Sequence, residues 1–68
     1  MKHLFRFQLD WRVRASTYNL AAYYDVYSIP NDSKNVLVKW THGFEVFEVT
    51  YTVEEMNYNL KHEVWVKI

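Results

Sequence analysis

The chain of 68 residues contains no cysteine, one glycine and one proline. The lack of cysteine excludes disulfide bridges and any zinc site built on thiolates. A single glycine also excludes a glycine-rich loop that wraps a phosphate group. Neither sign of charge is in excess, because eight basic residues balance eight acidic ones. Proteins that bind duplex DNA usually carry a basic excess, so the composition argues against that class of partner.

Long apolar runs are missing as well. Charged residues interrupt the N-terminal segment at short intervals, so we expect neither a signal peptide nor a membrane-spanning segment. No cysteine pattern points to an oxidising compartment, and a cytoplasmic location is therefore the default expectation. The chain carries no cofactor-binding motif, and we expect no cofactor.

Apolar and aromatic residues are abundant, at 50% and 19% of the chain. A large aromatic ring buries roughly 150–250 Å², which is enough for a few rings to offset much of the entropy lost on folding. We therefore expect residues 1–68 to form a single compact domain rather than a disordered chain.

The first segment alternates between apolar and polar residues. This period of two predicts a strand over residues 3–13 with one side in the core. The predicted core side carries His3, Phe5, Phe7, Leu9, Trp11 and Val13.

Residues 16–28 show two periodicities. Ser16 is a good N-cap and the pair Ala21–Ala22 favours a helix, so we predict a helix in this segment. A period of two fits the same residues and leaves a strand as the alternative. In that alternative, one side of the strand is formed by Leu20, Ala22, Tyr24 and Val26.

Residues 35–41 and 44–52 flank the dipeptide His42–Gly43 at the spacing of a tight hairpin. With these two residues in the turn, Val38 pairs with Phe47. Thr52 and Glu55 then match a capping box, which predicts a helix over residues 53–60. Residues 62–68 alternate again and predict a last strand, with Val64, Val66 and Ile68 inward and Trp65 outward.

The predicted order is strand, helix, strand, strand, helix, strand. This order is typical of an α+β, ferredoxin-like βαββαβ domain, a four-stranded antiparallel sheet with two helices on one face. The alternative is an all-β antiparallel meander with one short helix, which follows if residues 18–28 are extended.

Catalytic groups do not converge in either arrangement. His3, His42 and His62 lie far apart along the predicted sheet, and no histidine pair has the spacing of metal ligands. The serines lie in cap or loop contexts without a nucleophile motif. We therefore expect no metal site and no catalytic residues, and the prediction is that the protein is not an enzyme.

The outer face of the sheet, opposite the predicted core, carries apolar residues ringed by both signs of charge. This composition is typical of a protein-binding surface with an apolar centre. We predict a small non-catalytic protein-binding module, a regulatory or inhibitory accessory protein of the kind that phages and mobile elements encode, or one that forms a homodimer. The predicted contact residues are Leu4, Arg6, Leu37, Lys39, Val46, Trp65 and Lys67.

Two other functions stay open from the sequence. Single-stranded nucleic acid could bind the same face if Trp65 stacks on a base, although the neutral charge balance makes nucleic acid the weaker alternative. A small toxin-like or hydrolytic enzyme is the third reading, and it would require histidines and carboxylates to meet.

Overall fold

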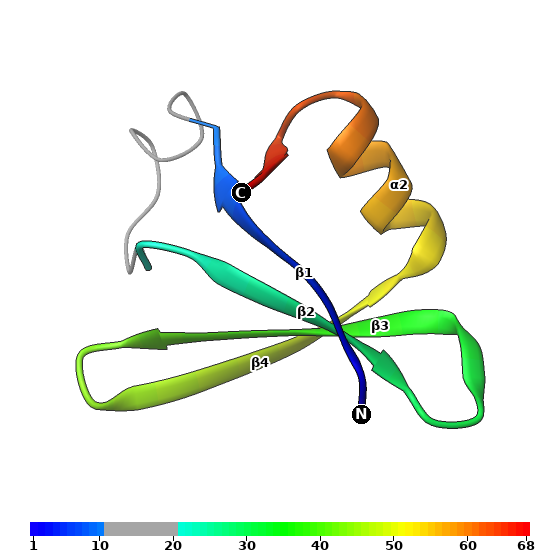
Figure 1. Ribbon diagram of the computed structural model, residues 1–68, viewed down its shortest axis with the longest axis horizontal. Coiled ribbons are helices and arrows are strands. Elements are labelled where there is room, and N and C mark those ends of the chain that lie inside the picture. Colours follow the sequence, from blue (N-terminus) through cyan, green and yellow to red (C-terminus); the bar gives the residue numbers. More distant parts are fainter. Residues whose placement is uncertain (11–20) are drawn as a thin grey trace.

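The computed structural model describes residues 1–10 and 21–68 as an antiparallel sheet with one helix packed against it (Figure 1). The order of the five strands across the sheet is β4-β3-β2-β1-β5. The elements along the chain are β1 (His3–Leu9), β2 (Tyr24–Ile29), β3 (Asp32–His42), β4 (Glu45–Thr52), α2 (Val53–Lys61) and β5 (Trp65–Lys67).

The segment with two periodicities is extended where the structure describes it. Tyr24–Ile29 forms β2, so the predicted helix is wrong there, while residues 16–20 of that prediction lie outside the described residues. The two-residue turn Pro30–Asn31 explains this, because it joins Ile29 directly to Asp32 in β3. Asn31 takes a φ of 63°, and proline followed by positive φ is typical of a type II turn. The meander with one short helix therefore fits better than the ferredoxin-like arrangement.

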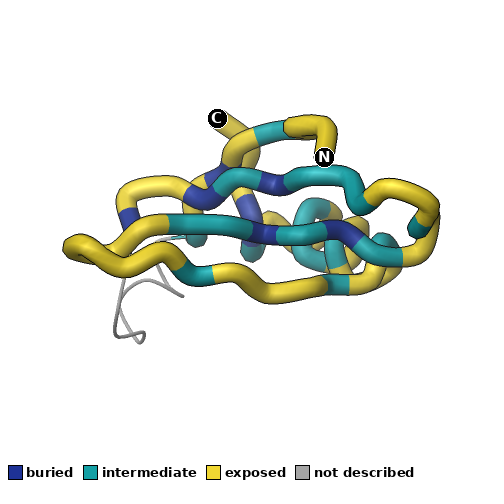
Figure 2. The backbone as a smooth tube through the Cα atoms, turned by 90° about the horizontal axis from the view of Figure 1, so that it is seen from below, coloured by how far each residue is buried: buried dark blue, intermediate teal, exposed yellow. Residues whose placement is uncertain are grey.

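The core lies between one face of the sheet, the core face, and α2. Phe7, Val26 and Val38 are almost fully buried on neighbouring strands of this face, and the buried segments lie along the middle of the sheet (Figure 2). The helix adds partly buried apolar residues that pack against this cluster, which are Val53, Met56 and Leu60. Period-two alternation places the opposite, outer face away from this cluster.

The predicted core side of β1 is confirmed in part. Phe7 is buried, and Phe5 and Leu9 pack against the core. His3 differs, because the register with β2 shifts between His3 and Phe5, so that His3 pairs with Tyr27. This irregularity turns His3 to the outer face. Trp11 and Val13 lie outside the described residues.

The β3–β4 hairpin forms with a different turn from the predicted one. Gly43 and Phe44 make the loop, His42 pairs with Glu45, and Val38 pairs with Val49 instead of Phe47. Gly43 takes a φ of 64° at the first loop position, where a type II′ turn needs it. The predicted turn places His42 there, and any residue with a Cβ takes a positive φ less readily than glycine does. Because the change moves each partner by two residues, every side chain keeps its face.

The helix prediction is confirmed at its start. The Thr52 hydroxyl accepts a hydrogen bond from the Glu55 backbone N–H, and the Glu55 carboxylate accepts one from the Thr52 N–H, each 3.0 Å long. At the other end, the N–H of Val64 donates to the carbonyl of Asn59, and the N–H of Glu63 to that of Leu60. These two bonds form a Schellman motif, in which Glu63 takes the left-handed position with a φ of 57°.

Replacing Glu63 by glycine is expected to raise the free energy of unfolding by about 0.5–1 kcal/mol, because a left-handed backbone is strained for residues with a Cβ. Urea denaturation followed by circular dichroism measures the change. Glu54→Gly in the first turn of α2 is the control, and it should lower stability by about 1 kcal/mol. Equal losses in both variants would contradict the strain at Glu63.

Candidate functional site

Trp65 lies in the core, so its predicted outward position is wrong. Its side chain is 4% exposed, and its ring stacks on Phe7 with the ring centroids 4.2 Å apart. A second contact, edge to face, joins it to Tyr51 at 5.0 Å. The outer face therefore lacks the aromatic centre that the sequence predicts for it.

Lys67 also lies on the side opposite to the prediction. It pairs with Phe7 across β1 and β5, and its Nζ lies 4.7 Å from the ring centroid of Phe5. Both errors have one cause. Strand β5 spans three residues, too few for alternation to identify the inward side, and the large Trp65 ring buries more area than Val66, which is 46% exposed.

Four of the seven predicted contact residues do share the outer face, namely Arg6, Leu37, Lys39 and Val46. Their positions follow from the pairing, because directly opposite residues of neighbouring strands point to the same face. Leu4 is 43% exposed and lies at the register shift of β1. Whether any of these residues binds a partner stays a prediction.

A row of alternating charge crosses the outer face from β1 to β4. The pairs Arg6–Asp25, Asp25–Lys39 and Lys39–Glu48 place these four residues side by side. Arg6 Nε lies 2.9 Å from Asp25 Oδ1, and Lys39 Nζ lies 3.6 Å from Glu48 Oε1. Each cation therefore has an acidic neighbour, and the row as a whole is neutral.

Asp25 is the centre of this row. The carboxylate of Asp25 accepts one hydrogen bond from Arg6 at each oxygen, and its Oδ1 also lies 2.8 Å from Nε2 of His3. Partial burial raises the pKa of Asp25, but the hydrogen bonds from Arg6 and His3 outweigh it and hold this pKa below its ordinary value. The same hydrogen bond favours the charged guanidinium and therefore raises the pKa of Arg6. Asp25 is thus ionised at neutral pH and fixes the position of the guanidinium.

Tyrosine rings flank the charged row. The guanidinium carbon of Arg6 lies 3.7 Å from the ring centroid of Tyr23, and Lys39 Nζ lies 5.8 Å from that of Tyr27. Between these groups is a shallow hollow of about 220 Å³. The hollow is lined by residues of β1, β2, β3 and β4 and by the residue before β2. These include Arg6, Tyr23, Asp25, Tyr27, Lys39 and Val46.

Sequence reasoning missed Tyr23, Asp25 and Tyr27 because it assigned them to a helix. The signal that could have found them is the alternative period of two, which puts Tyr24 and Val26 inward and these three outward. We name the set of Arg6, Tyr23, Asp25, Tyr27, Leu37, Lys39 and Val46 the outer-face cluster.

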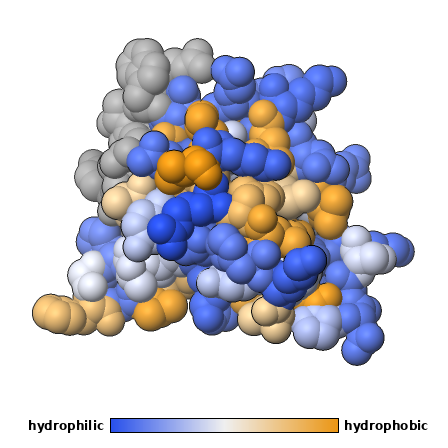
Figure 3. Space-filling model, in the orientation of Figure 1, coloured by the Kyte–Doolittle hydropathy of each residue, from blue (hydrophilic) through white to orange (hydrophobic). Residues whose placement is uncertain are grey.

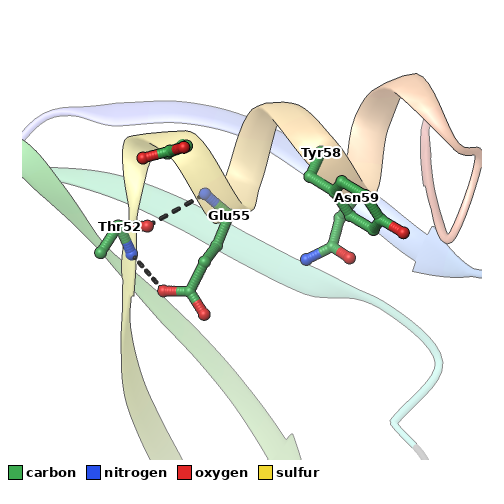
Figure 4. Close-up of a pocket in the computed structure, with 5 residues that line it drawn as sticks. Thr52, Glu55, Tyr58 and Asn59 are labelled. Carbon is green, nitrogen blue, oxygen red and sulfur yellow. Dashed lines mark hydrogen bonds between the residues drawn. The ribbon is translucent and has the colours of Figure 1, made fainter.

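A second hollow, of about 350 Å³, lies beside the start of α2. Figure 4 shows that two of its polar residues, Thr52 and Glu55, are bonded to each other in the capping box. These bonds are sufficient to explain why both residues are there. The outer-face cluster is therefore the better candidate site, since it combines exposed aromatic, apolar and charged groups from several strands.

Other chemistry has less support in the described residues. Within residues 1–10 and 21–68, no group of three or more histidine, aspartate or glutamate side chains is placed to hold a metal ion. His3 contacts Asp25, and His62 packs on Tyr58 with the ring centroids 4.2 Å apart. His42 flanks the hairpin turn. In the same part of the chain, no helix is long and apolar enough to cross a membrane.

Colouring the surface by hydropathy shows how hydrophilic and hydrophobic residues are distributed on it. On the face presented in Figure 3, charged and apolar groups are interspersed, and no single wide apolar patch forms. Bulk hydropathy does not distinguish an interface from the rest of a protein surface, so the candidate site is defined by its individual residues.

Comparison with known proteins adds no relative. Protein-family models, curated proteins and solved structures were all searched, and none matches this chain.

Proposed function

We propose that the protein is a small non-catalytic binding module that engages a partner protein through the outer-face cluster. The observation that carries this proposal is the pairing of Arg6 with the ring of Tyr23, which is 43% exposed beside the hollow. Tyrosine and arginine are among the residues most often found as binding hot spots. A domain of this size that only binds suits an accessory protein that regulates or inhibits its partner.

Preorganisation supports the same proposal. Two hydrogen bonds to Asp25 hold the Arg6 side chain over Tyr23. A partner therefore meets a surface whose long side chain is already ordered, and this reduces the entropy lost on binding. Val46, 62% exposed at one border of the hollow, and the half-buried Leu37 supply apolar area next to it.

A protein partner is favoured over nucleic acid. Trp65 is buried and does not present its ring for stacking on a base, and both Arg6 and Lys39 have acidic neighbours within 4 Å. A salt titration distinguishes the two classes, because contacts to phosphate weaken steeply as the salt concentration rises. Binding through apolar and tyrosine contacts should change little.

The test uses two matched tyrosine variants. Tyr23→Ala removes an exposed ring from the outer-face cluster, whereas Tyr58→Ala removes one that is 61% exposed on α2. With a partner isolated from the native cell and purified, we expect Tyr23→Ala to weaken binding by roughly thirtyfold or more, the effect of losing a hot spot of about 2 kcal/mol. Tyr58→Ala should bind like the unmodified protein.

Leu37→Glu is the companion variant, since it places a carboxylate between the apolar groups of the cluster. Circular dichroism must show that each variant keeps the fold. If Tyr23→Ala and Leu37→Glu bound the partner as tightly as Tyr58→Ala and the unmodified protein, the outer face would be excluded as the binding surface.

A further inference from the structure

Strand β4 is an edge of the sheet. Among the described strands it has a neighbour, β3, on one side only. The β3–β4 ladder runs without a register shift from His42–Glu45 to Asn35–Thr52, and the two strands form the long hairpin of Figure 1. The other side of β4 presents backbone N–H and C=O groups that a further strand could pair with.

Proteins usually protect such edges by keeping them short or by placing charged side chains, above all lysine, or a proline or a bulge in them. The opposite edge follows this rule, because β5 spans three residues and includes Lys67. Strand β4 has less protection, since its sequence EVFEVTYT has eight residues with two glutamates but no lysine or proline, and its register is continuous. A long, regular edge with so little protection is expected where a partner strand covers it.

The hairpin geometry identifies the backbone groups that face outward. A two-residue loop is closed by a hydrogen-bonded pair, here His42 and Glu45. Every second residue after Glu45 therefore turns its backbone groups toward β3. The N–H and C=O groups of Val46, Glu48 and Thr50 point away from the sheet.

Val49 is an apolar residue of the core face that is left uncovered at this edge. It is 40% exposed, although Val38, directly opposite on β3, is 2% exposed. A strand added beside β4 would cover Val49 and extend the core face over it.

We propose that the occupant is a second copy of this chain, with the two β4 strands antiparallel and a twofold axis at Val49. This register pairs every residue from Val46 to Thr52 and sets Phe47 opposite Tyr51. Glu48 then faces Thr50, so no like charges are directly opposed. An axis at Glu48 pairs equally many residues but opposes two carboxylates, and an axis at Phe47 or Thr50 pairs fewer.

The resulting dimer has one continuous sheet made of both five-stranded sheets. The twofold axis stands perpendicular to the sheet, so both copies of α2 lie on the same side. The outer-face clusters of both copies stay accessible on the opposite side. The dimer is thus independent of the proposed binding through that face.

The cysteine-free chain allows a direct test by cross-linking. Val49 faces its copy as a non-hydrogen-bonded pair with Cα atoms about 4.5 Å apart, within the range of a disulfide. Val49→Cys should therefore oxidise almost completely to a covalent dimer at micromolar concentration. Thr50→Cys on the same strand is the matched control, because its two copies lie more than about 7 Å apart, too far for a bridge. It should react only through random collisions.

Analytical ultracentrifugation provides the test without a cross-link. The unmodified protein should sediment as a dimer, and Thr50→Pro should sediment as a monomer that keeps its circular dichroism spectrum. Proline is tolerated at this position of an edge strand, where the N–H faces solvent, but it removes a hydrogen bond of the new ladder. A monomeric unmodified protein would overturn the proposal, and so would equal cross-linking of Val49→Cys and Thr50→Cys.

Discussion

Replacing Trp65 by alanine is expected to lower the free energy of unfolding by about 3–5 kcal/mol, the usual cost of truncating a large buried aromatic residue. The indole ring is 4% exposed and contacts Phe7 and Tyr51. It also joins the short strand β5 to the core. A domain of 68 residues has a total stability of roughly 3–10 kcal/mol, so the variant should be largely unfolded.

Urea denaturation followed by far-ultraviolet circular dichroism measures this loss. Val66→Ala is the control, since Val66 is the next residue of the same strand and is 46% exposed. Its effect should stay within about 0.5 kcal/mol. Trp65→Phe should cost less than alanine because it keeps a ring against Phe7. If Trp65→Ala were as stable as the unmodified protein, the ring would not be part of the core.

The strand faces could be predicted from the sequence because a period of two is a strong signal over long segments. In β1, β3 and β4 the side chains lie on the predicted faces, apart from His3, even though the register of the hairpin differs. That register moved by two residues, which changes partners but not faces. In β5 the same reasoning is wrong, because three residues are too few to show which face is inward, and burial of the large Trp65 ring turns Trp65 and Lys67 to the core face and Val66 outward.

The candidate site was predictable in part for a related reason. Arg6, Leu37, Lys39 and Val46 lie on strands with clear alternation, whereas Tyr23, Asp25 and Tyr27 lie in a segment that also fits a helix. Pairing with β1 and β3 decides between the two structures, and this pairing depends on residues far away in the sequence. The bond between Arg6 and Asp25, 19 residues apart, is a product of that pairing.

Replacing Val26 by threonine is expected to lower the free energy of unfolding by about 1–3 kcal/mol, although the two side chains have nearly the same shape. Val26 is 0% exposed, so the new hydroxyl loses its hydrogen bonds to water on folding, and its neighbours Phe5 and Val38 offer no side-chain partner. Val46→Thr makes the same change at a residue that is 62% exposed, and there the hydroxyl stays hydrated. Urea denaturation of both variants should therefore separate a clear loss at Val26 from almost none at Val46. Equal losses would mean that the two valines have similar surroundings, and the assignment of core and outer face would fail.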